Sequence, residues 1–172
     1  MTWSIAVTLA LRSLLVVLFL PFSALDKILN FNGAVAQARE AIPSDAAARL
    51  AIVAALCIEI IMPLGILTGV ADRLAALIMA GYCGITALLW KQFWRPGDFW
   101  STGGSRARDL FWDFLKNLSL AGGFLLITFG TNAGQVEALL SHPQLSSHPY
   151  STHSMTGTRA SCSTGSRVGD GP

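Results

Sequence analysis

Two charged residues lie inside long apolar segments, where charges are rarely found. Arg12 is near the middle of the first apolar segment and Glu59 is near the middle of the second. A charge at that depth in a membrane costs at least ~2.5–3.5 kcal/mol, so it is normally paired or in contact with water. The similar depth and opposite charge predict that Arg12 and Glu59 face each other. The pair is either purely structural or a site where Glu59 takes up a proton or binds a polar headgroup.

Further polar residues gather toward one end of the apolar segments. Asp113, Lys116 and Asn117 are separated by three and four residues, which places all of them on one helical face. Asp26 and Lys27 end the first segment, and antiparallel threading brings them to the same end. One interpretation is a polar, ligand-binding crevice; the other is a set of helix ends with snorkelling lysines. The candidate crevice residues are Arg12, Asp26, Lys27, Glu59, Asp113, Lys116 and Asn117.

Other kinds of chemistry find little support in the sequence. All three histidines lie in the C-terminal tail, which excludes haem held by two histidines within the membrane. The three cysteines form no CxxC pair, which argues against a zinc knuckle or a thioredoxin-type site. The net charge of +2 is too small to predict nucleic-acid binding. We therefore predict no metal site and no nucleic-acid partner, and the sequence identifies no catalytic residue.

Four apolar segments are long enough to position these residues on membrane helices, which need about 17–25 residues. They cover roughly residues 3–25, 47–68, 74–90 and 111–129. The chain is 52% hydrophobic and only 13% charged, whereas soluble domains are ~25% charged. The predicted fold class is therefore all-α, an integral membrane four-helix bundle that occupies residues 1–131.

The connections predict how these helices are arranged. The segment "FNGAVAQAREAI" can form a short helix at the membrane surface, and Ser44 or Asp45 can cap the helix that follows. The short connection from Thr68 to Arg73 predicts that the second and third helices are antiparallel neighbours. Lysine and arginine are concentrated in the first and third connections, which the positive-inside rule places in the cytoplasm. Four tryptophans near the third connection are typical of an interfacial belt.

Residues 132–172 differ sharply in composition from the rest of the chain. They are rich in Ser, Thr, Gly and His, and from Ser141 onward they contain almost no large apolar residue. Such a segment cannot bury enough apolar surface to offset the entropy of ordering. We predict a disordered C-terminal tail.

The order of these motifs resembles the DoxX family over roughly residues 5–130. The most specific match is "FLKNLSLAGGFLLI" (Phe114 to Ile127), and Arg12, Asp26-Lys27 and Glu59 also match family positions. The resemblance implies a small four-helix protein of the bacterial inner membrane. Some relatives look like membrane subunits of thiosulfate:quinone oxidoreductases, and others are associated with complexes that contain sulfurtransferase and superoxide dismutase partners. Many members carry a histidine near the end of the third helix, where this chain has "LLWKQFW".

Three functions are compatible with these observations. The first is a membrane subunit of a redox complex, in which a quinone enters the crevice. The chain itself has no flavin, haem or thiol-pair motif, so a soluble or membrane oxidoreductase would be its partner and supply the electrons. The second is a non-catalytic anchor that recruits a soluble protein through Arg95, Arg106 and Arg108. The third is transport of a small solute or proton, for which four helices are few.

Overall fold

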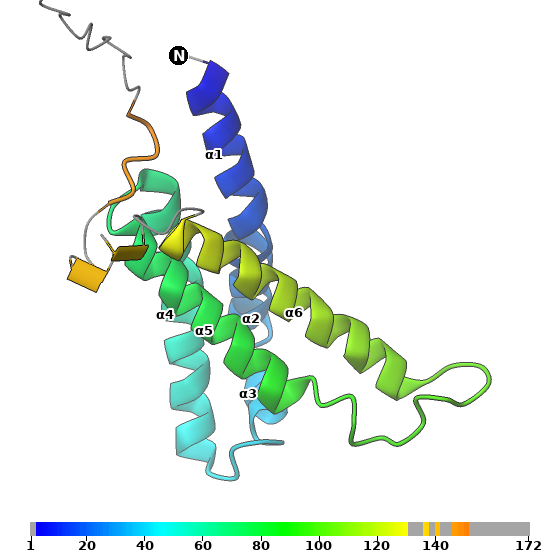
Figure 1. Cartoon of the computed structure of the whole chain (residues 1–172). Helices are drawn as coiled ribbons and strands as arrows, with labels where there is room; N and C mark the ends of the chain where they lie inside the picture. The colour runs from blue at the N-terminus through cyan, green and yellow to red at the C-terminus, as the bar shows by residue number, and fades with distance from the viewer. Residues whose placement is uncertain (1–2, 131–135, 138–139, 142–145, 152–172) are drawn as a thin grey trace, which may run out of the picture.

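The computed structural model describes residues 3–130, 136–137, 140–141 and 146–151. Within these residues all regular secondary structure is helical, and four helical spans are long and apolar enough to cross a membrane (Figure 1). The spans are Trp3–Leu29, Asp45–Thr68, Asp72–Trp90 and Arg106–Phe129. The prediction of an all-α membrane protein is confirmed.

The first span is a composite of α1 (Trp3–Val16), a π-helical segment η1 (Leu18–Ser23) and α2 (Ala24–Leu29). Pro21 lies inside η1. Proline has no N–H to donate and its ring displaces the preceding carbonyl, which explains why the wider π-turn forms here. The span ends four residues later than predicted, at Leu29 in place of residue 25, because the helix continues through the polar residues Asp26 and Lys27.

The short helix expected after the first span is present as α3 (Phe31–Ala38). Its Val35 and Ala38 are buried against Ala48 and Ile52 of α4. This contact holds α3 across the beginning of α4, so α3 forms one wall of the space between α2 and α4.

The remaining spans are α4 (Asp45–Thr68), α5 (Asp72–Trp90) and α6 (Arg106–Phe129). Ser44 caps α4 as predicted, because its side chain accepts a hydrogen bond from the Ala47 amide. Gly69 ends α4 with φ of 77°, a left-handed conformation that glycine adopts without strain. The tight turn that follows makes α4 and α5 the neighbours that the sequence predicts.

The 91–105 connection is folded onto the beginning of α6. The Asp98 carboxylate accepts hydrogen bonds from the amides of Arg106 and Ala107, 2.8 and 3.0 Å away. Arg108 donates back to carbonyls of the same connection, those of Phe99 and Ser101 among them. These contacts explain why α6 begins at Arg106, five residues before the apolar segment from which its start was predicted.

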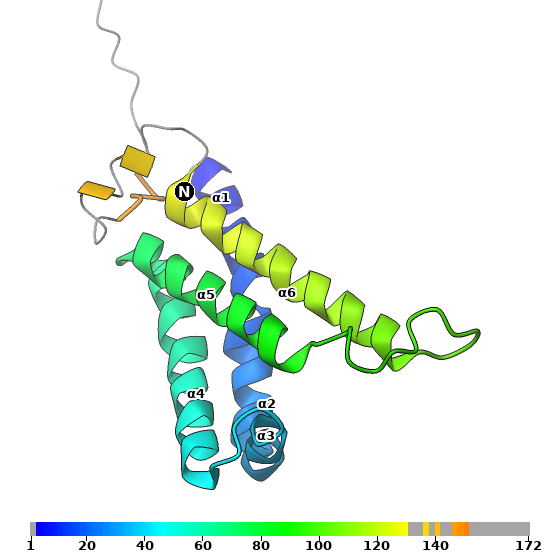
Figure 2. The same cartoon turned by 60° about the horizontal axis from the view of Figure 1, so that its bottom comes forward.

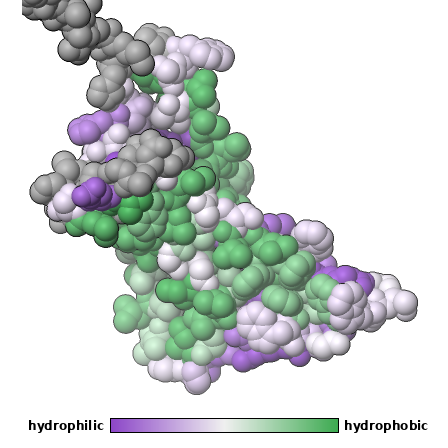
Figure 3. All heavy atoms as spheres, viewed as in Figure 1, coloured by the Kyte–Doolittle hydropathy of each residue, from purple (hydrophilic) through white to green (hydrophobic). Residues whose placement is uncertain are grey.

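Helices α5 and α6 run side by side and cross α1 and α4 obliquely (Figure 2). The buried core between them includes Val16, Phe19, Ile66, Met79 and Phe124. Large apolar side chains are also exposed on the outside, and green apolar surface covers most of the middle of the molecule (Figure 3). Leu14, for example, is 72% exposed. Such a surface requires a lipid environment, so the chain is a multi-pass membrane protein.

Candidate functional site

A buried carboxylate, Glu59 of α4, is the centre of a polar network inside the helical domain. The Lys27 ammonium lies 2.8 and 3.0 Å from its two oxygens. The hydroxyls of Ser23 and Tyr82 donate to Glu59 Oε1 at 2.8 and 2.7 Å. Lys27 also donates to Ser23 at 2.7 Å. We call these four residues the Glu59 network.

The π-helical turn and the helical spacing bring these groups together. Ser23 ends η1 and Lys27 follows four residues later in α2, so both side chains lie on the same face of the first span. Glu59 is 1% exposed and the Lys27 side chain is 19% exposed. A charge buried to this extent requires a partner, and the Lys27 ammonium neutralises Glu59 while the two hydroxyls add hydrogen bonds to its Oε1.

Three of the four residues of the Glu59 network lie in the wall of a cavity of about 680 Å³ between α2, α3, α4 and α5. Ser23, Lys27 and Tyr82 line the cavity, and most of the other lining residues are Ala, Ile and Leu. Where α3 meets the end of α5, the Trp90 indole donates to the Gln37 carbonyl at 3.2 Å. We call this space the α2–α5 cavity. It combines apolar walls with a few polar groups, as small-molecule sites do.

Gly81 lines the same cavity, and its surroundings leave room for a side chain. No neighbouring side chain lies within 4 Å of the position that a Cβ would take there. Small residues in membrane helices usually allow two helices to pack closely. Gly81 does not serve this purpose, because no neighbouring helix approaches it closely.

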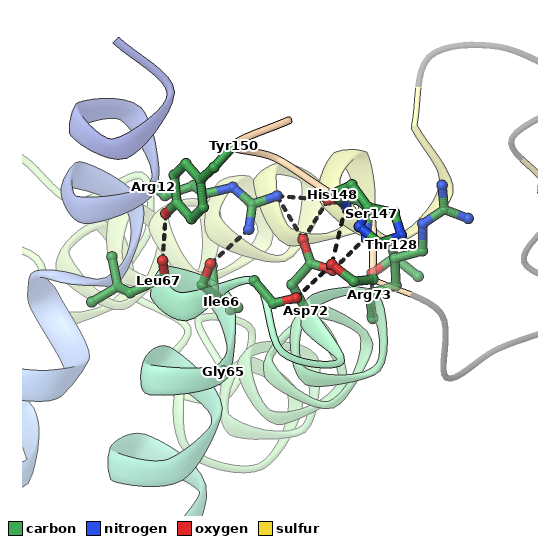
Figure 4. A network of polar contacts seen from close by, with 12 residues as sticks. Arg12, Gly65, Ile66, Leu67, Asp72, Arg73, Thr128, Ser147, His148 and Tyr150 are labelled. Carbon is green, nitrogen blue, oxygen red and sulfur yellow. Dashed lines mark hydrogen bonds and ion pairs between the residues drawn. The ribbon is translucent and has the colours of Figure 1, made fainter. Parts of the chain in front are cut away.

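Arg12 does not contact Glu59, so the predicted pair is wrong. Its guanidinium instead donates to Asp72 at 2.7 Å and to the Ile66 carbonyl at 2.6 Å (Figure 4). Ile66 lies seven residues beyond Glu59 on α4, which is ~10 Å along a helix axis. The prediction assumed that the ends of the two helices are level. The 83% exposure of Trp3 indicates instead that α1 extends past its neighbours (Figure 1).

A segment of the C-terminal tail completes the site around Arg12. The Ser147 hydroxyl accepts a hydrogen bond from Arg12 at 2.9 Å and donates to Asp72, and the Ser147 amide also donates to Asp72 at 2.9 Å. Tyr150 donates to the Leu67 carbonyl (Figure 4). Asp72 is completely buried as a result. The residues Ser146–Ser151, which we call the docked segment, thus contact the helices, while most of the tail for which disorder is predicted lies outside the described residues.

The predicted crevice residues of α6 contact neither the Glu59 network nor the site around Arg12 in the described part of the chain. Asp113 pairs with Lys91 at 2.9 Å and more loosely with Lys116 at 3.3 Å. The Lys116 side chain is 72% exposed. Asn117 donates to the Asp113 carbonyl. These residues lie on the outer side of α6 and at its contact with the end of α5, and none of the three lines the α2–α5 cavity.

The seven predicted residues therefore do not form one crevice. Lys27 meets Glu59, and Asp113 meets Lys116 and Asn117 in a separate group on α6, while Arg12 lies at the other end of α4 and Asp26 is exposed. The prediction grouped residues by depth, and it did not account for which face of each helix points inward.

Sequence reasoning missed some partners of these residues. Ser23 and Lys27 are four residues apart, a spacing that could have indicated a shared face. Tyr82 and Thr86 are also four residues apart, so they share a face of α5, and Tyr82 donates to Glu59 across the bundle. Asp72 stands in a short polar turn, where a charge is expected to be solvated, so the sequence gives no signal of its burial.

Comparison with known proteins gives one match. The DoxX family model matches residues 7–92, half of the chain. That stretch contains the whole Glu59 network as well as Arg12, Asp72 and Lys91, and it ends before α6. No curated protein and no solved structure gives a significant match.

Proposed function

Because the chain belongs to the DoxX family, we propose that it is a membrane subunit of a quinone-linked redox complex and that a quinone occupies the α2–α5 cavity. The observation that supports this most directly is the position of the Glu59 network in the wall of an apolar cavity. The cavity holds about 680 Å³, within the ~300–1,000 Å³ of small-molecule sites. That volume fits a quinone ring and the beginning of an isoprenoid tail.

The lining residues match the chemistry of a quinone. Its ring and tail require apolar walls, which residues such as Ile52, Ile58 and Ile85 supply. Its carbonyl oxygens require hydrogen-bond donors, and Lys27 and Tyr82 at the cavity wall, which donate to Glu59 in this structure, would turn an N–H or the O–H toward a bound quinone. A bound quinone supplies two-electron redox chemistry, while the electrons come from a partner protein.

The chain's own contribution in this proposal is to orient the ring and to hold a proton near it. The Tyr82 hydroxyl donates to Glu59 Oε1 at 2.7 Å, so its proton lies between the two oxygens beside the cavity. Lys27 balances the charge of Glu59 at the same point. The network is thus arranged to bind a polar headgroup from one side and to keep its own charges neutral overall.

A matched pair of glycine variants tests the proposal. Gly81 lines the cavity and Gly84 does not, and neither has a neighbouring side chain within 4 Å of a Cβ position. Gly81→Leu places a side chain in the cavity, whereas Gly84→Leu places the same side chain elsewhere on α5. We would measure binding of a short-tailed benzoquinone to the purified full chain in mild detergent.

We expect Gly81→Leu to weaken quinone binding at least about tenfold, which is ~1.4 kcal/mol, and Gly84→Leu to leave it unchanged. Equal affinities for the wild type and both variants would contradict a quinone in this cavity. Glu59→Gln and Lys27→Met should then also reduce quinone-dependent activity of the intact complex. Unchanged activity in both would contradict the role of the network.

A second proposal, an anchor that recruits a soluble protein, depends on the 91–105 connection and the beginning of α6. Arg108 is engaged with carbonyls of its own connection, so it is a structural residue in this context. Arg95 and Arg106 are exposed, and Trp100, which lies between them in the sequence, is 91% exposed. Reversing the charge of Arg95 and Arg106 should release a recruited partner, and retention of the partner after both changes would contradict this proposal.

A further inference from the structure

A second concave surface lies on the outside of the molecule, between η1 and α6. It has a volume of about 550 Å³ and is lined by Leu18, Trp112, Leu115, Lys116, Ser119 and Leu120. We call it the η1–α6 groove. It shares no lining residue with the α2–α5 cavity, so it is a separate site.

The groove presents a cation on a surface that faces lipid. Lys116 lies in the interior of the span Arg106–Phe129 and its side chain is 72% exposed. On the same surface Leu18 is 49% and Trp112 59% exposed. A lone ammonium in contact with acyl chains is unfavourable, so Lys116 must reach either water or an anion.

The charges around Lys116 do not balance. Asp113 is its only described carboxylate partner, at 3.3 Å, and that carboxylate is shared with Lys91, which lies closer at 2.9 Å. Two ammonium groups thus face one carboxylate. The excess positive charge beside the groove is complementary to one anionic group.

We propose that the η1–α6 groove binds an anionic phospholipid. The phosphate contacts Lys116, and an acyl chain lies against Leu18, Leu115 and Leu120. Trp112 lies one helical turn from Lys116 toward the beginning of α6, where tryptophan favours the headgroup level of a bilayer. A soluble anion would use the charge but not the apolar walls, and a neutral lipid would use the walls but not the charge. An anionic phospholipid uses both.

The test compares two lipids on the full chain in mild detergent, by native mass spectrometry with added dioleoyl phosphatidylglycerol or dioleoyl phosphatidylcholine. We expect the wild type to bind phosphatidylglycerol more tightly. Lys116→Gln should weaken phosphatidylglycerol binding about fivefold, the effect of one cation near an anionic lipid surface. It should weaken phosphatidylcholine binding less, because the choline of that headgroup offsets the charge of its phosphate. Arg106→Gln is the matched control, because it removes one exposed cation from the same end of α6 outside the groove.

Two further measurements separate the groove from general charge attraction. Ser119→Trp fills the groove without changing its charge, so it should weaken binding of both lipids. Inorganic phosphate at millimolar concentration should not displace phosphatidylglycerol. Equal losses in Lys116→Gln and Arg106→Gln, unchanged binding in Ser119→Trp, or displacement by inorganic phosphate would each overturn the proposal.

Discussion

Lys27 and Glu59 form a buried ion pair with both carboxylate oxygens within 3.0 Å of the ammonium nitrogen. They come from different spans, α2 and α4, so the pair joins the first span to the second inside the apolar interior. Removing one charge leaves the other without a counter-ion in a site that water barely reaches. Removing both leaves no buried charge.

We therefore expect Lys27→Met or Glu59→Gln alone to destabilise the folded chain by about 3–5 kcal/mol. The double variant Lys27→Met/Glu59→Gln should lose less than either single variant. Thermal unfolding of the purified chain, followed by the helical circular dichroism signal, measures this. Additive losses in the double variant would show that the two residues do not act as a pair.

Arg12 presents a different requirement, because its two terminal nitrogens bond three partners: Ile66, Asp72 and Ser147. A planar guanidinium reaches these partners from one fixed position, whereas an ammonium is a single donor centre on a flexible stem. We expect Arg12→Lys to lose about 1–3 kcal/mol of stability through the unpaired groups that it leaves behind. The same unfolding assay measures it, and Lys27→Arg provides the reverse substitution at a site where an ammonium already reaches its acceptors on Glu59 and Ser23. Wild-type stability in Arg12→Lys would contradict the geometry.

The docked segment depends on Asp72 through Ser147. Both the amide and the hydroxyl of Ser147 donate to this buried carboxylate. Ser147→Ala removes the hydroxyl contacts, and bonds to a charged group are worth about 1.5–3 kcal/mol. We expect chymotrypsin to cut after Tyr150 at least about tenfold faster in this variant, because the segment opens more often.

Ser151→Ala is the control for that experiment. Its hydroxyl donates only to His148 within the same segment, so the cleavage rate should stay at the wild-type value. A rate for Ser147→Ala equal to that of Ser151→Ala would mean that the segment is not held through Asp72.

Sequence patterns predict the membrane spans of this chain but not the partners of its buried charges. Runs of Leu, Ile and Val determine that a segment spans a membrane, so the spans and the antiparallel α4–α5 pair could be predicted. The partner of a buried charge depends on the relative shift of two helices, and a shift of one turn is only ~5.4 Å. Arg12 therefore pairs with Asp72 at the start of α5 and not with Glu59, and no local pattern encodes that choice.

The same limit applies to contacts between distant segments. The bond from Tyr82 to Glu59 could be anticipated, since a polar stripe on a membrane helix must find a partner. The contact of Ser147 with Asp72 could not, because the tail has neither apolar periodicity nor caps that would indicate order. Composition describes the average behaviour of a segment, whereas docking depends on a few specific hydrogen bonds.

Asp98 makes the fold of the 91–105 connection dependent on pH. Burial acts to raise its pKa, but the amides of Ala107 and Arg106 donate to the carboxylate and outweigh this, so the pKa lies below its ordinary value of 3.8. A lowered folded-state pKa means that the ionised form stabilises the fold. That stabilisation is fully present above pH 3.8 and is lost as the pH falls through the lowered folded-state value.

Fluorescence of the exposed Trp100, isolated by replacing the other tryptophans with phenylalanine, reports on this connection. We expect an acid transition below pH 3.8 in the chain with Asp98. Asp98→Asn should remove that transition and show the altered fluorescence already at neutral pH. An identical acid transition in Asp98→Asn would assign it to another group.

Two adjacent glycines of α6 differ in what they face, and this difference gives a sharp test of helix packing. A Cβ at Gly123 would lie 3.0 Å from Leu15 Cδ1 of α1, whereas a Cβ at Gly122 meets nothing within 4 Å. Gly122→Ala should therefore stabilise the chain by about 0.5–1 kcal/mol, the usual gain from removing a glycine inside a helix. Gly123→Ala should gain less, because the end of Leu15 must move.

The corresponding leucine variants should differ more strongly. Gly123→Leu should lose about 1–3 kcal/mol of stability through overpacking, while Gly122→Leu should not. Equal effects at the two positions in thermal unfolding would mean that α1 and α6 do not approach closely at Gly123.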